Sequence, residues 1–185
     1  MRFVSALLAA GLLCAQAAAD EVDLSFSSDA FRVVYLHDIT NSRLNVEGGW
    51  LDNGDYGRAL HVGLTLRGFA SGGANPVRAG VGGRFAVVDG DLSNQSGYGL
   101  GMGGFLSYTF TRFNRITLTG AAYFAPDILT GSDLEKYQDY TARLGYQILR
   151  DAEIYLGVRY VKGSFDVTPE VLFDDGAHIG FSIRF

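Results

Sequence analysis

Apolar and polar residues alternate with a period of two over much of this chain, the pattern of β-strands that have one apolar face. The clearest run ends the chain. Its apolar positions are Ala177, Ile179, Phe181, Ile183 and Phe185, and its polar positions are His178, Gly180, Ser182 and Arg184. Segments 60–67 and 140–148 repeat the pattern. Because no stretch after residue 19 has the ~18 continuous apolar residues of a spanning helix, the sequence excludes a helical membrane protein.

Ten strands are predicted from this alternation, separated by turn-rich gaps. They are expected at 22–28, 30–38, 43–51, 57–68, 77–88, 98–110, 115–124, 137–148, 153–162 and 175–185. Most have the ~9–11 residues with which a tilted strand crosses the hydrocarbon core of a membrane.

Arginine and glycine occupy the polar face of these strands, and this composition distinguishes a membrane barrel from a soluble β-sandwich. A soluble sandwich would carry Lys, Glu, Ser and Thr on that face. After residue 19 the chain has 12 Arg and only two Lys, and six arginines have the polar parity: Arg67, Arg78, Arg84, Arg143, Arg159 and Arg184. Arginine tolerates confinement because several acceptors can satisfy its planar fork. A polar interior with an apolar exterior predicts a closed antiparallel transmembrane β-barrel.

The number of strands in the wall must be even if both ends of the chain lie on one side of the membrane. The hairpin of 22–28 and 30–38 has a short first arm, so the prediction is ten strands, with eight and an N-terminal hairpin outside the wall as the alternative. With the last strand ending in the periplasm, gaps 89–97, 125–136 and 163–174 fall outside and the shorter 111–114 and 149–152 inside. The inside gap 69–76 is a long exception.

Residues 1–19 differ from the rest and predict a secretory signal peptide. An apolar stretch follows Arg2, and Gln16-Ala17-Ala18-Ala19 gives an Ala-x-Ala cleavage site near Ala19. The mature domain is then 20–185, with a net charge of −6 because Arg2 is lost from a chain of −5. An acidic chain lacks the electrostatic footprint of nucleic-acid binding. Since Cys14 is the only cysteine, the mature chain has no disulfide, thiolate metal site or thiol nucleophile.

Residues at the end of the chain and near the ends of the strands are expected to take part in membrane insertion and to lie at the membrane interfaces. Phe181, Ile183 and the terminal Phe185 form the expected membrane-insertion signal, which the barrel-assembly machinery would use. Aromatic residues near strand ends are expected in two interfacial girdles: Trp50, Tyr56, Tyr98, Tyr108, Phe110, Phe124, Tyr137, Tyr160 and Phe185.

The barrel interior holds the candidate functional residues. Inward glycines on two neighbouring strands would leave clearance in the lumen: Gly80, Gly82, Gly99, Gly101 and Gly103. A lumen ion cluster is expected from Glu47, Arg84, Arg143, Glu153 and Arg159. Two outcomes stay open. The arginines pair with the two glutamates in a filled plug, or they line a narrow path that favours anions.

Catalytic and metal sites are not expected. His61, His178 and Ser182 have inward parity, but His178 and Ser182 stand four residues apart on one strand, which places them ~13 Å apart at ~3.3 Å per residue. Three scattered His and the loop acids give no metal-ligand spacing. The sequence therefore predicts no enzyme, no metal and no cofactor.

Several segments resemble the YfaZ family of Gram-negative proteins. They are Arg78-Ala79-Gly80-Val81-Gly82-Gly83-Arg84, Ala122-Tyr123-Phe124-Ala125-Pro126, Tyr140-Thr141-Ala142-Arg143-Leu144-Gly145-Tyr146-Gln147, Gly157-Val158-Arg159-Tyr160 and Asp174-Asp175-Gly176-Ala177-His178-Ile179-Gly180-Phe181. The resemblance covers roughly 57–185 and implies an outer-membrane barrel described as a porin, without catalytic residues.

The resulting expectation is a monomer in the outer membrane of a Gram-negative bacterium, in contact with membrane lipid and lipopolysaccharide. It would act as a small porin or as a structural barrel, with a weak anion preference if it conducts. The alternative is a barrel-anchored protein whose outside loops, such as 163–174, bind lipopolysaccharide or another partner. A lipid-modifying hydrolase is a remote third class.

Overall fold

The computed structural model describes residues 20–69, 76–90, 95–166 and 170–185. The predicted signal peptide, 1–19, lies outside the described residues. The elements are β1 (Asp20–Phe26), β2 (Ala30–Asp38), β3 (Leu44–Asn53), β4 (Gly57–Phe69), β5 (Val77–Gly90), β6 (Gln95–Thr109), β7 (Ile116–Ala125), the 3-10 helix η1 (Asp127–Leu129), β8 (Thr130–Ser132), β9 (Leu134–Gln147), β10 (Ala152–Phe165) and β11 (Val171–Arg184). Within these ranges no helix has the length and apolarity to cross a membrane.

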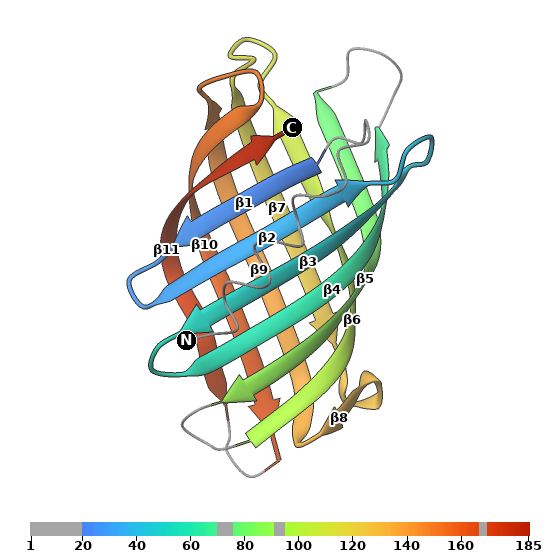
Figure 1. The fold of residues 1–185 in the computed structure, drawn as a ribbon, viewed down its shortest axis with the longest axis vertical. Helices are drawn as coiled ribbons and strands as arrows, with labels where there is room; N and C mark the ends of the chain where they lie inside the picture. The colour runs from blue at the N-terminus through green and yellow to red at the C-terminus, as the bar shows by residue number, and fades with distance from the viewer. Residues whose placement is uncertain (1–19, 70–75, 91–94, 167–169) are drawn as a thin grey trace.

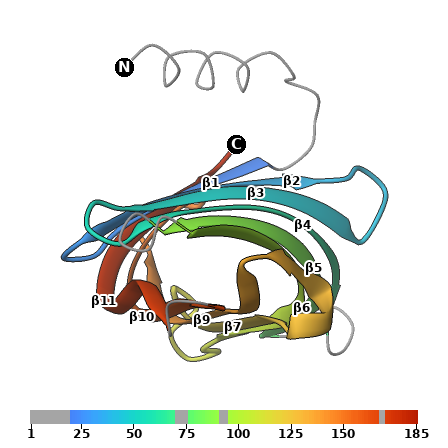
Figure 2. The same cartoon turned by 90° about the horizontal axis from the view of Figure 1, so that it is seen from below.

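Ten of the strands form one closed antiparallel barrel (Figures 1 and 2). The first and last strands complete the ring, since β1 pairs with β11 from Glu21↔Arg184 to Phe26↔Ile179. β1 also pairs with β2 along its whole length, so the N-terminal hairpin belongs to the wall. The prediction of ten strands is confirmed, and the eight-stranded alternative is wrong.

The remaining strand, β8, has three residues and was not predicted. β7 pairs with β6 only as far as Met102↔Phe124, and β8 then pairs with Gly97–Gly99 of β6 beyond the end of β7. β8 therefore continues the wall where β7 is too short to do so, at the lower end of the barrel in Figure 1.

The two ends of the barrel are distinct. We call the end where β1 begins and β11 finishes the termini end, and the opposite end the distal end. Connections 39–43, 110–115 and 148–151 lie at the termini end, and 27–29, 54–56 and 126–133 lie at the distal end. At the 54–56 hairpin, Asn53 Oδ1 accepts hydrogen bonds from the backbone N–H groups of Asp55 and Tyr56, at 3.0 and 3.2 Å. This Asx turn stops β3 and reverses the chain.

The outer face of the wall is apolar. Along β4 the outward residues are Leu60, Val62, Leu64 and Leu66, with 49–56% of each exposed, and the residues between them point inward. Outward residues of β6, β10 and β11 follow the same rule. Such a continuous apolar exterior is what a hydrocarbon environment requires, so the predicted inside-out polarity holds for the outer face.

A β-bulge in β11 changes the parity of its first residues. β10 and β11 pair as Val161↔Asp174 and then Lys162↔Leu172, which leaves Phe173 as the extra residue. Phe173 and Asp174 are both buried in consequence, at 0% and 4% exposure. β11 thus begins at Val171, four residues before the predicted start, and Asp174 lies within a strand rather than in a loop.

The lumen is apolar near the distal end, and the expectation of a polar interior is wrong there. Eleven buried residues of seven wall strands form one core cluster: Leu51, Ala59, Ala86, Val88, Ala125, Leu134, Tyr137, Val161, Phe165, Val171 and Phe173. Tyr137 was expected in an aromatic girdle, yet it points inward and is 3% exposed. Phe165, Val171 and Phe173 come from the segment 163–174, which was expected as an outside loop, and these three side chains instead help to fill the distal lumen.

Candidate functional site: the barrel interior

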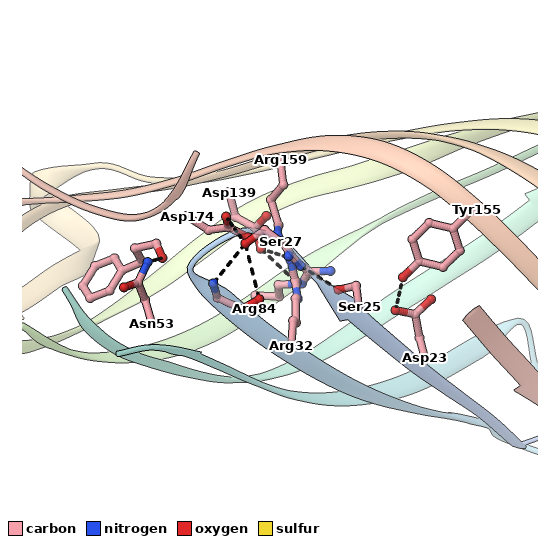
Figure 3. A network of polar contacts seen from close by, with 12 residues as sticks. Asp23, Ser25, Ser27, Arg32, Asn53, Arg84, Asp139, Tyr155, Arg159 and Asp174 are labelled. Atoms are coloured by element: carbon pink, nitrogen blue, oxygen red, sulfur yellow. Dashed lines mark hydrogen bonds and ion pairs between the residues drawn. The ribbon is translucent and has the colours of Figure 1, made fainter. Parts of the chain in front are cut away.

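Buried charges form a layer across the middle of the lumen, next to the distal core (Figure 3). Its centre is Asp139 on β9, whose Oδ2 accepts hydrogen bonds from Arg84 Nη1 at 2.8 Å and Arg32 Nη2 at 3.1 Å. Arg84 also contacts Glu47 through its Nε, and its guanidinium carbon lies 3.7 Å from the centre of the Tyr123 ring. These contacts join β2, β3, β5, β7 and β9 across the barrel, and one carboxylate is shared by arginines from two strands.

A second group joins β1, β10 and β11. Arg159 Nε donates to Asp174 Oδ2 at 2.5 Å, and Arg159 Nη1 donates to Ser25 Oγ at 3.0 Å. Ser27 Oγ donates to the other oxygen of Asp174 at 3.0 Å. Asp174 has the inward parity of Gly176 and His178 on β11, and the ion pair with Arg159 satisfies a carboxylate that would otherwise be buried alone.

A third group lies nearer the termini end. Arg143 Nη1 on β9 donates to Asp23 Oδ2 at 2.6 Å, and the Tyr155 hydroxyl donates to Asp23 Oδ1 at 2.7 Å. The Arg143 guanidinium carbon lies 4.6 Å from the centre of the Tyr155 ring. The Arg143 side chain keeps 24% exposure although it points into the lumen, so it faces an open space.

The structure therefore places the predicted ion-cluster residues in separate groups. Glu47 and Arg84 are in contact, whereas Arg143 and Arg159 bind carboxylates that were not predicted. Among the described residues, Glu153 forms no ion pair with any of these arginines, and its side chain covers Gly145. Sequence reasoning missed three acids: Asp23, Asp139 and Asp174. Asp23 could have been found from its inward parity between Val22 and Leu24, and Asp139 from sharing the inward parity of Arg143 on β9.

The predicted clearance glycines line the corner of the wall formed by β5 and β6, but they differ in what surrounds them. A Cβ on Gly82 would lie 2.1 Å from Leu64 O, and one on Gly103 would lie 2.0 Å from Ala122 O. At these two positions the missing side chain makes room for a neighbouring backbone rather than for the lumen. Gly80 lies under Phe105, while Gly99 lies under Thr130 and Ala125. Only at Gly101, among the five, is the nearest atom as far as 3.6 Å.

A chamber of about 790 Å³ occupies the lumen on the termini side of the charge layer. It reaches the rim at the exposed hairpin residues Ser42 and Arg43, and it ends inside the barrel at Arg84, Glu47 and Arg159. None of the eleven residues of the distal core lines it. In the described part of the chain, the chamber is therefore open at the termini end and blind toward the distal end. A second hollow of about 150 Å³ lies at the termini rim beside Glu153 and Arg184.

The inward histidines are held over glycines. His61 covers Gly49, and His178 covers Gly157 and meets the Tyr155 ring edge-on, with ring centres 5.8 Å apart. Across the described ranges no hydrogen bond joins His61 or His178 to a serine or a carboxylate. Groups of three or more His, Cys, Asp or Glu side chains suited to a metal ion do not occur there either.

The residues of the predicted insertion signal lie on the outer face. Phe181, Ile183 and Phe185 are 36%, 43% and 68% exposed. The backbone of Phe185 exchanges two hydrogen bonds with Asp20, at 2.9 and 3.0 Å, so the last residue helps to close the seam between β1 and β11.

Comparison with known proteins agrees with this architecture. The family model described as "YfaZ precursor" matches residues 1–185. The chain is also 30% identical over 143 residues to "Outer membrane protein YfaZ" of Escherichia coli (strain K12), covering 77% of this chain and 75% of that protein. With its closed barrel and apolar exterior, the chain belongs to the YfaZ family of outer-membrane proteins.

Proposed function

We propose that this outer-membrane protein works as a closed structural barrel with a one-sided chamber, rather than as a constitutively open porin. The observation that carries the proposal is the distal core, in which eleven buried side chains fill the lumen. An ion that crossed this region would lose its hydration among apolar groups, and burying an unpaired charge in such surroundings is prohibitively costly.

The charge layer supports the same reading. Arg84, Arg32 and Arg159 each pair with a carboxylate from another strand, so these guanidinium groups connect strands of the wall instead of lining a free path. The proposal gives no catalytic role to the inward His61 and His178, and it places lipid against the apolar outer face of a monomer.

Single-channel recording of the purified mature protein in planar bilayers tests the proposal. We expect no discrete openings from the natural sequence, and openings after the double substitution Phe165→Ala and Phe173→Ala, which removes two large rings from the distal core. Regular openings of the natural protein would contradict the closed barrel. If those openings selected anions, they would support the small porin instead.

A second candidate is a barrel-anchored interaction protein, and one exposed residue favours it. Ile128 in η1 is 89% exposed at the distal end, between β7 and β8. Lipopolysaccharide that copurifies with the protein can be measured for Ile128→Ser and for the control Phe113→Ser, since Phe113 is 61% exposed at the opposite end. A specific loss with Ile128→Ser would support this candidate, and equal amounts from both variants would remove its basis.

A further inference from the structure

Three donor side chains surround Gly157 on the wall of the chamber. Arg143, Gly157 and His178 lie directly opposite one another on β9, β10 and β11. Arg159 follows Gly157 by two residues on β10, so its side chain has the same inward parity. All three side chains line the chamber, and we call Arg143, Arg159 and His178 the donor patch.

The donor patch has unused hydrogen-bonding capacity. Arg159 is 3% exposed and His178 is 4% exposed, yet Arg159 Nη2 and His178 Nδ1 have no partner among the described protein atoms. Arg143 contacts Asp23 through Nη1 while its side chain stays 24% exposed toward the chamber. A guanidinium can only donate, and a buried donor without an acceptor costs free energy. Arg159 Nη2 therefore lacks an acceptor, and His178 Nδ1 is a second free donor in the tautomer that carries its proton there.

The patch is held in place before any ligand arrives. Asp23 and Asp174 bind the two arginines from the β1 and β11 side of the wall, leaving the remaining nitrogens for another group. Gly157 has no side chain between them, and a Cβ there would lie 2.7 Å from Ala142 O and from the His178 ring. Donors fixed by neighbours in this way bind an acceptor with little further ordering.

Charge and size narrow the class of ligand. Eight arginines and five carboxylates line the chamber. Asp139 and Asp174, which contact these arginines from outside the lining, still leave one positive charge in excess, whereas the full chain carries −5. The volume of about 790 Å³ lies in the range of small-molecule pockets. The rings of Phe105, Tyr123 and Tyr155 add apolar surface to the lining.

We propose that the donor patch binds a small organic anion, through a carboxylate or a phosphate monoester, which enters the chamber from the termini end. The inference rests on the closed distal half proposed above, because a continuous channel would pass such a molecule instead of holding it. Two oxygens of the anion accept from Arg143, Arg159 and His178, and its organic part lies against the aromatic rings.

Isothermal titration of the folded mature protein in detergent micelles at low salt tests this inference. The probes are glycerol 3-phosphate for a phosphate monoester, glutarate for a carboxylate, and neutral glycerol. We expect saturable binding of at least one anion and none of glycerol, and the comparison of the two anions tells which acid is preferred.

Three variants locate the binding. His178→Phe keeps a ring over Gly157 and removes its donor, and Arg143→Gln removes a charge from the patch, so each should weaken binding by about tenfold. Arg112→Gln is the control, because Arg112 is exposed in a termini-end turn and is not part of the chamber lining. This control should change affinity less than about twofold. Heat-modified gel mobility shows which variants are folded, and His178→Phe suffices if Arg143→Gln is not.

The ligand site is overturned if neither anion binds saturably, if His178→Phe binds as well as the natural sequence, or if Arg112→Gln weakens binding equally. Its failure is distinguishable from failure of the closed barrel. If the bilayer recordings show no openings and the titration shows no anion binding, only the ligand site is contradicted. Channel openings contradict the closed barrel, whatever the titration shows.

Discussion

At the scale of single residues, Asp139 is the acceptor on which the buried charge layer depends. It is 2% exposed and accepts from both Arg32 and Arg84, which reach it from β2 and β5. Arg84 also contacts Glu47, but no other carboxylate in the described structure is shared by the two arginines. Removing one partner from a buried ion pair leaves an uncompensated charge, which costs more than the pair contributes.

Asp139→Asn should therefore lower the free energy of unfolding by about 3–5 kcal/mol, as measured by urea titration of the folded protein in lipid vesicles. The matched control is Asp52→Asn. Asp52 lies 3.7 Å from Arg58 with both side chains about half exposed, so its loss should cost about 0–1 kcal/mol. Equal effects of the two substitutions would show that the interior charges are as well solvated as those at the rim.

Two glycines at the β5–β6 corner provide a second test at this scale. Gly82→Ala and Gly103→Ala would each bring a methyl group to about 2 Å from a carbonyl oxygen of the next strand, so the backbone must move. We expect each to lower the free energy of unfolding by about 1–3 kcal/mol. Gly101→Ala is the control, because its nearest neighbour lies 3.6 Å away. Full tolerance at all three would mean that these glycines provide lumen clearance only.

At the scale of elements, most of the strands could be predicted because outward residues alternate strictly with inward ones. The predicted strand at 30–38 is identical to β2, and the one at 57–68 misses β4 by one residue. The start of β11 could not be predicted, because the bulge at Phe173 puts two consecutive residues inside and breaks the period of two. β8 has only three residues, too few to show a period.

The apolar distal core also could not be predicted from the alternation. Alternation assigns a residue to the inner or the outer face but gives no depth along the barrel. Ala86, Val87 and Val88 are consecutive apolar residues, and only the first and third point inward. The polar parity of Arg84 on the same strand was correctly recognised, so the interior was expected to be polar along its whole length.

The core can be tested at Phe173, the bulge residue, which is fully buried. Phe173→Ala leaves a cavity among Phe165, Leu134 and Gly163, and it should lower the free energy of unfolding by about 3–5 kcal/mol in the same urea assay. Phe113→Ala, in an exposed turn, should change it by less than about 0.5 kcal/mol. A small effect at Phe173 would indicate that the distal lumen is hydrated.

At the scale of the whole molecule, the barrel has three zones along its axis. An open chamber begins at the termini end, a layer of ion pairs crosses the middle, and an apolar core fills the distal end. The inward direction of the arginines could be predicted from the sequence, because the parity of a residue along its strand fixes the face on which it lies. Their partners could not be predicted, since the contacts of Arg84 with Asp139 and of Arg159 with Ser25 join residues 55 and 134 positions apart.

Thiol accessibility tests this zoning most directly, because the mature chain has no cysteine of its own. Ala121 lines the chamber and Ala86 lies in the distal core at 1% exposure, so Ala121→Cys and Ala86→Cys place one small thiol in each zone. With a small charged methanethiosulfonate reagent and the folded protein in detergent, we expect rapid labelling at 121 and protection at 86 until the barrel is unfolded. Equal labelling of the two folded variants would contradict a blind chamber.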